Sequence, residues 1–199
     1  MVIILFTSIG YLFWRQEMRY WLPTPIPPHY QSVAVGQVVS APDLTRSGKP
    51  VLLHFFNPDC PCSRFNTEQF QSLAKQYGDQ VQFYAVLPET TASPGAVAER
   101  FAITVPMLVD SEKRLAKACG VYSTPQAALL DRTGKLYFRG NYNQSRYCTA
   151  EKTAFVKMAL ASLVAGQPAP LLGLAATDSY GCQLSETTRE WSGLPLKLE

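Results

Sequence analysis

Residues 51–63 read Val51-Leu52-Leu53-His54-Phe55-Phe56-Asn57-Pro58-Asp59-Cys60-Pro61-Cys62-Ser63. The apolar run follows a Lys-Pro pair and predicts a buried strand. Pro58 and Asp59 predict a turn after it. Asp59 or Cys60 can then cap a helix, with Pro61 tolerated in its first turn. The turn therefore places Cys60 at the positive end of a helix dipole, a location that favours a reactive thiolate.

The composition indicates one folded domain of roughly 150 residues with appendages. Of the 199 residues, 47% are hydrophobic and 17% are charged, which supports a packed core and excludes global disorder. The net charge of +3 is spread along the chain without a basic block, so no nucleic-acid partner is expected. The five cysteines and two histidines have neither zinc-ribbon nor small disulfide-scaffold spacing, and we expect no metal site and no cofactor.

The N-terminal residues are expected to form a membrane anchor over 1–22, followed by a stiff Pro-rich spacer over 23–32. Residues 2–14 are almost wholly apolar, and Arg15, Arg19, Tyr20 and Trp21 follow them as in an interfacial belt. Thirteen helical residues span only about 20 Å of a hydrocarbon core about 30 Å thick. A cleaved signal peptide and a soluble hydrophobic helix are the alternatives, although no A-x-A-like cleavage site follows.

The body of the chain alternates strand and helix patterns before it ends in a hairpin and a helix. Apolar runs and helical periodicity give the order β-α-β-α-β-α-β-β-α, with a weak strand pattern before it at 33–41. Strands are expected at 51–56, 81–87, 105–109, 126–130 and 135–139, and helices at 63–77, 95–101, 111–119 and 151–165. This order predicts an α/β sandwich with a mixed central sheet flanked by helices. The domain is expected to cover 33–166, with residues 167–199 packing on it as a tail.

Two motifs together resemble the thioredoxin-like fold. One is the strand and turn that lead to Cys60, and the other is Gly120-Val121-Tyr122-Ser123-Thr124-Pro125 before Gln126. The closest similarity is to membrane-anchored thiol oxidoreductases and peroxiredoxin-related redoxins, over roughly residues 33–166. The resemblance implies that Cys60 is the nucleophile and that the bond before Pro125 is cis. It also implies that Thr124 and Pro125 form the substrate-binding edge opposite Cys60.

The Cys-Pro-Cys motif departs from the Cys-x-x-Cys of thioredoxins. Ser63 occupies the place of the resolving cysteine, and Cys62 falls one residue early. His54 replaces the buried carboxylate that the family carries six residues before the nucleophile. His54 could accept or relay a proton, or be a half-buried, hydrogen-bonded strand residue. We take Cys60 and Cys62 as candidate catalytic residues and His54 and Ser63 as auxiliary ones.

The thiol that resolves a mixed disulfide on Cys60 is left open by the sequence. Cys62 is nearest, but residues i and i+2 lie on different sides of a helix, so this pairing needs a non-helical turn. Cys148 or Cys119 approaching from elsewhere, or an external thiol, are the other candidates. Cys148 and Cys182 flank the last helix and are expected to form a structural disulfide, whereas Cys119 is most simply a core residue.

The function that these features favour is thiol–disulfide oxidoreduction with protein thiols or disulfides as substrates. A thiol peroxidase is disfavoured because Asn57 and Leu53 stand where the Pro-x-x-x-Thr-x-x-Cys motif needs Thr and Pro. A Cu(I)-binding module and a non-catalytic binding domain are the further alternatives.

The resemblance implies a bacterial inner-membrane protein with a single-pass anchor and a periplasmic domain. The basic residues after the apolar segment would by themselves place the body in the cytoplasm. This signal is discounted, because a start codon assigned too late would remove basic residues before the segment. The sequence does not indicate an oligomeric state.

Overall fold

A five-stranded mixed sheet forms the centre of the computed structural model, which describes residues 2–16, 22–42, 44–45, 47–91 and 93–184. The strand order is β3-β2-β1-β5-β6. These strands are β1 (Val51–Phe55), β2 (Gln82–Pro88), β3 (Met107–Asp110), β5 (Gln126–Leu130) and β6 (Leu136–Gly140). β1 pairs parallel with β2 and antiparallel with β5, so the sheet is mixed as expected.

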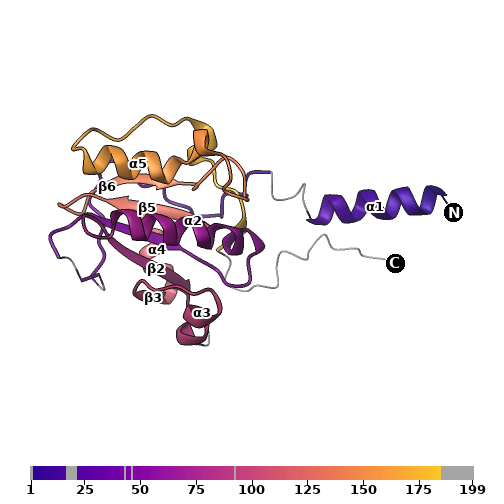
Figure 1. Ribbon diagram of the computed structural model, residues 1–199, viewed down its shortest axis with the longest axis horizontal. Coiled ribbons are helices and arrows are strands. Elements are labelled where there is room, and N and C mark those ends of the chain that lie inside the picture. Colours follow the sequence, from indigo (N-terminus) through magenta and orange to yellow (C-terminus); the bar gives the residue numbers. More distant parts are fainter. Residues whose placement is uncertain (1, 17–21, 43, 46, 92, 185–199) are drawn as a thin grey trace.

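Helices cover both faces of this sheet (Figure 1). They are α2 (Pro61–Tyr77), α3 (Pro94–Arg100), α4 (Arg114–Cys119) and α5 (Phe155–Val164). Alternate residues of β1 point to opposite faces. Leu52 and Phe56 belong to one core cluster with residues of α2 and α5, and Leu53 and Phe55 belong to a second with residues of α4. The α/β sandwich expected from the sequence is thereby confirmed.

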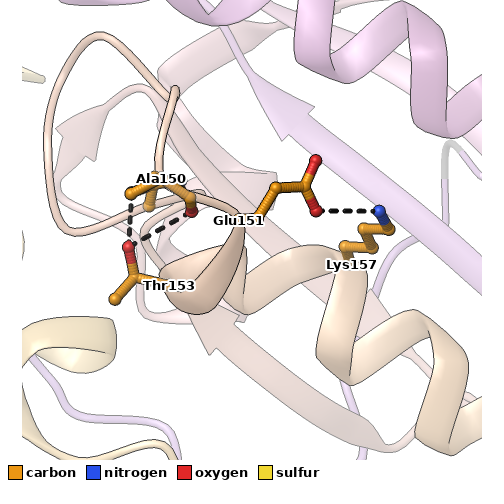
Figure 2. Close-up of polar contacts among 5 residues, drawn as sticks. Ala150, Glu151, Thr153 and Lys157 are labelled. Carbon is orange, nitrogen blue, oxygen red and sulfur yellow. Dashed lines mark hydrogen bonds and ion pairs between the residues drawn. The ribbon is translucent and has the colours of Figure 1, made fainter.

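The expected strands and helices of the body lie within a few residues of their observed positions. The exception is 33–41, which forms no strand. It has an isolated bridge between Val38 and Lys135 and a few backbone hydrogen bonds to residues 134–136. Helix α5 follows a short 3₁₀ turn, Glu151–Thr153. Figure 2 shows the contact of Thr153 with Ala150 and the exposed Lys157–Glu151 ion pair. The Thr153 hydroxyl donates to the Ala150 carbonyl at 3.4 Å, and the ion pair measures 3.2 Å. Such exposed pairs add little stability, so packing of its apolar face is what holds α5 on the sheet.

The tail runs back over the domain after α5. Its short helix α6 (Leu174–Thr177) lies against β6, where the Asn141 amide donates to the Ala176 carbonyl at 2.8 Å. A Cβ at Gly140 would stand 2.1 Å from that same carbonyl oxygen. The close approach therefore depends on Gly140 having no side chain. Beyond α6, strand β7 (Cys182–Gln183) pairs antiparallel with β4 (Ser123–Thr124).

Helix α1 (Val2–Gln16) carries the apolar N-terminal segment. Among the residues that the structure describes, no helix has both the length and the apolar character needed to cross a membrane. Part of the expected anchor, residues 1 and 17–21, lies outside the described residues, as does the end of the tail, 185–199.

Candidate active site around the Cys60–Cys182 disulfide

Cys60 is the N-cap of the 17-residue helix α2, and Pro61 is in its first turn. The preceding turn is closed by Asn57, whose side-chain oxygen accepts from the Asp59 amide at 2.9 Å and whose carbonyl accepts from the Cys60 amide at 3.0 Å. Ser63 is buried and its hydroxyl accepts from the Asn57 amide at 3.3 Å. The residue in the usual resolving position thus has a structural contact with the turn that presents Cys60.

Cys60 is bonded to Cys182, which the sequence analysis did not pair with it. The two Cα atoms are 6.0 Å apart across a sequence separation of 122 residues. The expected Cys148–Cys182 disulfide is therefore wrong for this structure, since Cys182 is held over the Cys60 site by the β4–β7 pairing. Cys148 is instead half-buried beside α2, where its sulfur accepts from the Asn66 side-chain amide at 3.1 Å.

The Thr124–Pro125 bond is cis and lies against Cys60. The Cys60 sulfur is 3.5 Å from the Thr124 carbonyl oxygen, a contact rather than a hydrogen bond because a disulfide sulfur carries no proton. The structure thus brings Cys60, Thr124 and Pro125 together as the resemblance implied. A cavity of about 460 Å³ adjoins this edge, with Thr124, Leu184 and Lys117 among its lining residues.

The three cysteines around the disulfide differ in exposure. Cys60 is 1% exposed and Cys62 is 0% exposed, and both pack in one apolar cluster, whereas Cys182 is partly exposed. Of the two bonded cysteines, Cys182 is therefore the one on the side from which an incoming thiol can approach. Cys119 lies away from this cluster in the core on the α4 face of the sheet. Burial raises the pKa of its thiol to about 12, as fits a core residue.

His54 is fully buried rather than half-buried. Its ring stacks on Phe70 at 4.2 Å between centroids and meets the edge of Tyr142 at 5.2 Å. Neither ring nitrogen has a hydrogen-bond partner in the described part of the chain. Burial lowers the pKa of His54 to about 3, so the imidazole is neutral near pH 7. This environment favours a packing role and disfavours a proton relay at neutral pH.

Within the described residues no cluster of three or more His, Cys, Asp or Glu side chains could hold a metal ion. Asn57, which stands where a peroxidase has its threonine, uses its side chain to close the turn.

The sequence comparison assigns a family to most of the chain. Residues 31–184 match the family described as "Domain of unknown function (DUF6436)". The chain belongs to this family. The DUF6436 match includes β7 and Cys182, so it covers both halves of the disulfide.

Two relatives of this DUF6436 protein are named thiol–disulfide oxidoreductases. YkuV of Bacillus subtilis is 33% identical over 94 residues, which cover 44% of this chain and 64% of YkuV. ResA of Geobacillus thermodenitrificans is 32% identical over 123 residues, which cover 53% of this chain and 68% of ResA. They confirm the resemblance to thioredoxin-like thiol–disulfide oxidoreductases.

A solved structure supports the fold of the DUF6436 protein. The crystal structure of a hypothetical protein from Sinorhizobium meliloti matches with a TM-score of 0.64 at 21% identity. The match covers 79% of this chain and 97% of the other. At this identity the likeness concerns the fold alone.

Sequence reasoning missed Cys182 as the partner of Cys60. The pairing depends on the path of the tail, which no local pattern in the sequence indicates. Two features of the sequence could have pointed to Cys182: the odd number of cysteines, five, and the glycine immediately before it, Gly181.

Proposed function

We propose that this protein is a thiol–disulfide oxidoreductase in which Cys60 is the nucleophile and Cys182 is its disulfide partner. The observation that carries the proposal is the Cys60–Cys182 bond at the N-terminus of α2, against the cis Thr124–Pro125 edge. Relatives named thiol–disulfide oxidoreductases support the same chemistry.

In the reducing direction, the Cys60 thiolate attacks one sulfur of a substrate disulfide. A Cys60–substrate disulfide forms, and the other substrate sulfur leaves as a thiolate that takes up a proton. The Cys182 thiolate then attacks the Cys60 sulfur, which forms Cys60–Cys182 and releases the second substrate thiol. Two protein thiols are oxidised and one substrate disulfide is reduced.

A dithiol then returns the protein to its reduced form. Its thiolate attacks the partly exposed Cys182 sulfur, and Cys60 leaves as a thiolate. The N-terminus of α2 favours this leaving group, because the helix dipole stabilises negative charge there. The second thiol of the reductant releases Cys182. The reverse sequence oxidises a substrate dithiol, so the same site supports either direction.

The remaining site residues take supporting roles in this proposal. Thr124 and Pro125 form the edge on which the substrate main chain lies. Ser63 holds the turn before Cys60, and Cys62 provides apolar packing against the disulfide. His54 packs in the core against Phe70 and Tyr142.

The location proposed for the protein is the periplasmic side of a bacterial inner membrane, with α1 as the membrane-associated segment. The large apolar side chains of α1 support this location, because those such as Ile3, Leu5 and Phe13 are more than half exposed. The Cys60–Cys182 disulfide suits an oxidising compartment. The anchor 1–22, spacer 23–32 and domain 33–166 remain the proposed division of the chain, with the tail after them.

A redox titration tests the proposed function. The protein is equilibrated in dithiol–disulfide buffers, its thiols are alkylated, and labelled peptides are quantified by mass spectrometry. We expect Cys60 and Cys182 to become labelled together in one two-electron transition, which Cys119→Ala leaves at the same potential. Labelling of Cys60 at every potential, or independent titration of the two cysteines, would overturn the proposal.

A further inference from the structure

Residues 179–184, here called the tail segment, lie along the edge that the proposed function assigns to the substrate. Thr124 is paired with Cys182, and Ser123 with Gln183. The Leu184 amide donates to the Tyr122 carbonyl at 2.9 Å, which extends the contact beyond β4. The main chain of 122–124 is therefore already occupied by an extended segment whose cysteine is bonded to Cys60.

The other side of the tail segment is held by the spacer. The Thr24 amide donates to the Ser179 carbonyl at 2.6 Å, and the Thr24 hydroxyl donates to the Gly181 carbonyl at 3.2 Å. Pro23 and Tyr180 form an isolated antiparallel bridge. Most of these contacts are made by backbone groups, which accept many sequences. The side chains of Ser179 and Tyr180 are bonded as well: the Ser179 hydroxyl accepts from the Gln126 side chain at 2.6 Å, and the Tyr180 hydroxyl donates to the Asn143 carbonyl at 3.0 Å.

Gly181 is the position at which the backbone conformation and the space beside the cis-proline edge select a residue type. Its φ is +107°, in the region that favours glycine. A Cβ there would stand 2.2 Å from the Thr124 carbonyl oxygen and 3.4 Å from the Pro125 Cδ atom. The Pro125 distance is an ordinary contact, but the Thr124 oxygen is far too close, and as a backbone atom it cannot move away like the end of a flexible side chain. A segment that presents a cysteine to Cys60 along this path therefore needs glycine immediately before that cysteine.

We infer that the tail segment occupies the position of the substrate on this edge. The substrate of the Cys60 site is accordingly an extended polypeptide whose reactive cysteine directly follows a glycine. This inference rests on the proposed function. Cys60 is 1% exposed beneath the tail segment, so the substrate reaches it only when the segment leaves the edge. Substrate and tail segment thus alternate on residues 122–124. The substrate forms its mixed disulfide with Cys60 while the tail is away, and the returning Cys182 displaces it.

Two synthetic peptides test the selectivity. One is acetyl-Ser-Tyr-Gly-Cys-Gln-Leu-amide, the sequence of the tail segment, and the other carries valine in place of its glycine. The cysteine of each is linked to thionitrobenzoate. The reduced Cys182→Ser protein is used, because its Cys60 thiolate attacks the peptide sulfur, forms a Cys60–peptide disulfide and releases coloured thionitrobenzoate. Rates are divided by those of each peptide with free dithiothreitol, which removes intrinsic differences in reactivity.

We expect the Gly-Cys peptide to react at least about tenfold faster than the Val-Cys peptide, because the valine side chain would overlap the Thr124 carbonyl. Adding Gly181→Val to the same protein should expel the tail segment. Both normalised rates should then rise at least about threefold while the preference for glycine remains. Gly95→Ala is the matched control, since a Cβ there meets nothing within 4 Å, and it should change neither rate.

The outcomes separate this inference from the proposed function. Equal normalised rates for the two peptides would overturn the glycine requirement while leaving Cys60 as a reactive nucleophile. If Gly181→Val raised neither normalised peptide rate, the proposed competition between the tail segment and the substrate would be overturned. Failure of Cys60 to react with either peptide would overturn the proposed function, and the inference with it.

Discussion

Dithiothreitol alone reduces insulin slowly, and the wild-type protein is expected to accelerate this reaction. Replacing Cys60 with serine is expected to lower that acceleration at least about 1,000-fold. A serine hydroxyl does not ionise near neutral pH and cannot form the mixed disulfide. Serine remains a good N-cap, so the start of α2 should be retained. The rate is followed by the turbidity of reduced insulin chains. Cys119→Ala, which alters a cysteine in a different core cluster from the disulfide, should keep the wild-type rate within about twofold.

Cys182→Ser should behave differently from Cys60→Ser with the same substrate. The first attack by Cys60 is retained, but the protein thiol that resolves the mixed disulfide is lost. When the reduced variant is freed of dithiothreitol and then mixed with insulin, Cys60–substrate disulfides should therefore accumulate and be visible on non-reducing gels. Cys60→Ser should trap none. If Cys182→Ser trapped no substrate in the absence of dithiothreitol, another protein thiol such as Cys62 would be the resolver, and the assignment of Cys182 would be wrong.

Replacing His54 with phenylalanine is expected to remove a large part of the acid sensitivity of the fold. The pKa of His54 is lowered from 6.5 to about 3 by burial, so the unfolded chain binds a proton that the folded chain excludes. The stability linked to His54 is fully present above pH 6.5 and is lost as the pH falls towards 3. The wild-type free energy of unfolding should therefore lose about 1.4 kcal/mol per pH unit more than that of His54→Phe, or on the order of 4 kcal/mol across this window.

The measurement is urea denaturation of the wild type and His54→Phe at several pH values between 3.5 and 7. Phenylalanine suits the site because the ring of His54 already packs among Phe56, Phe70 and Tyr142. His29→Asn is the control, since His29 is exposed and asparagine tolerates its positive φ. Parallel curves for wild type and His54→Phe would show that His54 is not buried as a neutral group.

Local patterns made the central part of the fold predictable. The strand β1, the Pro58–Asp59 turn and the start of α2 depend on neighbouring residues, and the structure agrees with them within a few positions. The cis Thr124–Pro125 edge followed from the resemblance of its motif. The full burial of His54 could also have been predicted from the sequence. A continuous apolar run is typical of a strand covered on both faces, and a histidine within it has no solvated side.

The chemistry of the disulfide was less predictable, because it depends on a contact between distant parts of the chain. Cys182 reaches Cys60 only through the return of the tail over β6 and the two-residue pairing of β7 with β4. Neither element has enough length to give a periodic pattern. The weak strand pattern at 33–41 failed for a related reason, since its contact with residues 134–136 is too short to form a strand and amounts to one bridge at Val38 with a few backbone hydrogen bonds.

Peptide mapping of the native disulfides tests the central claim most directly. The oxidised protein is alkylated under denaturing conditions without reductant, digested, and analysed by mass spectrometry before and after reduction. We expect one dominant linked peptide pair, which joins the Cys60-Pro61-Cys62 peptide to the Gly181-Cys182 peptide through Cys60, with Cys119 and Cys148 alkylated. A Cys60–Cys62 disulfide, or a Cys148–Cys182 disulfide with Cys60 alkylated, would contradict it.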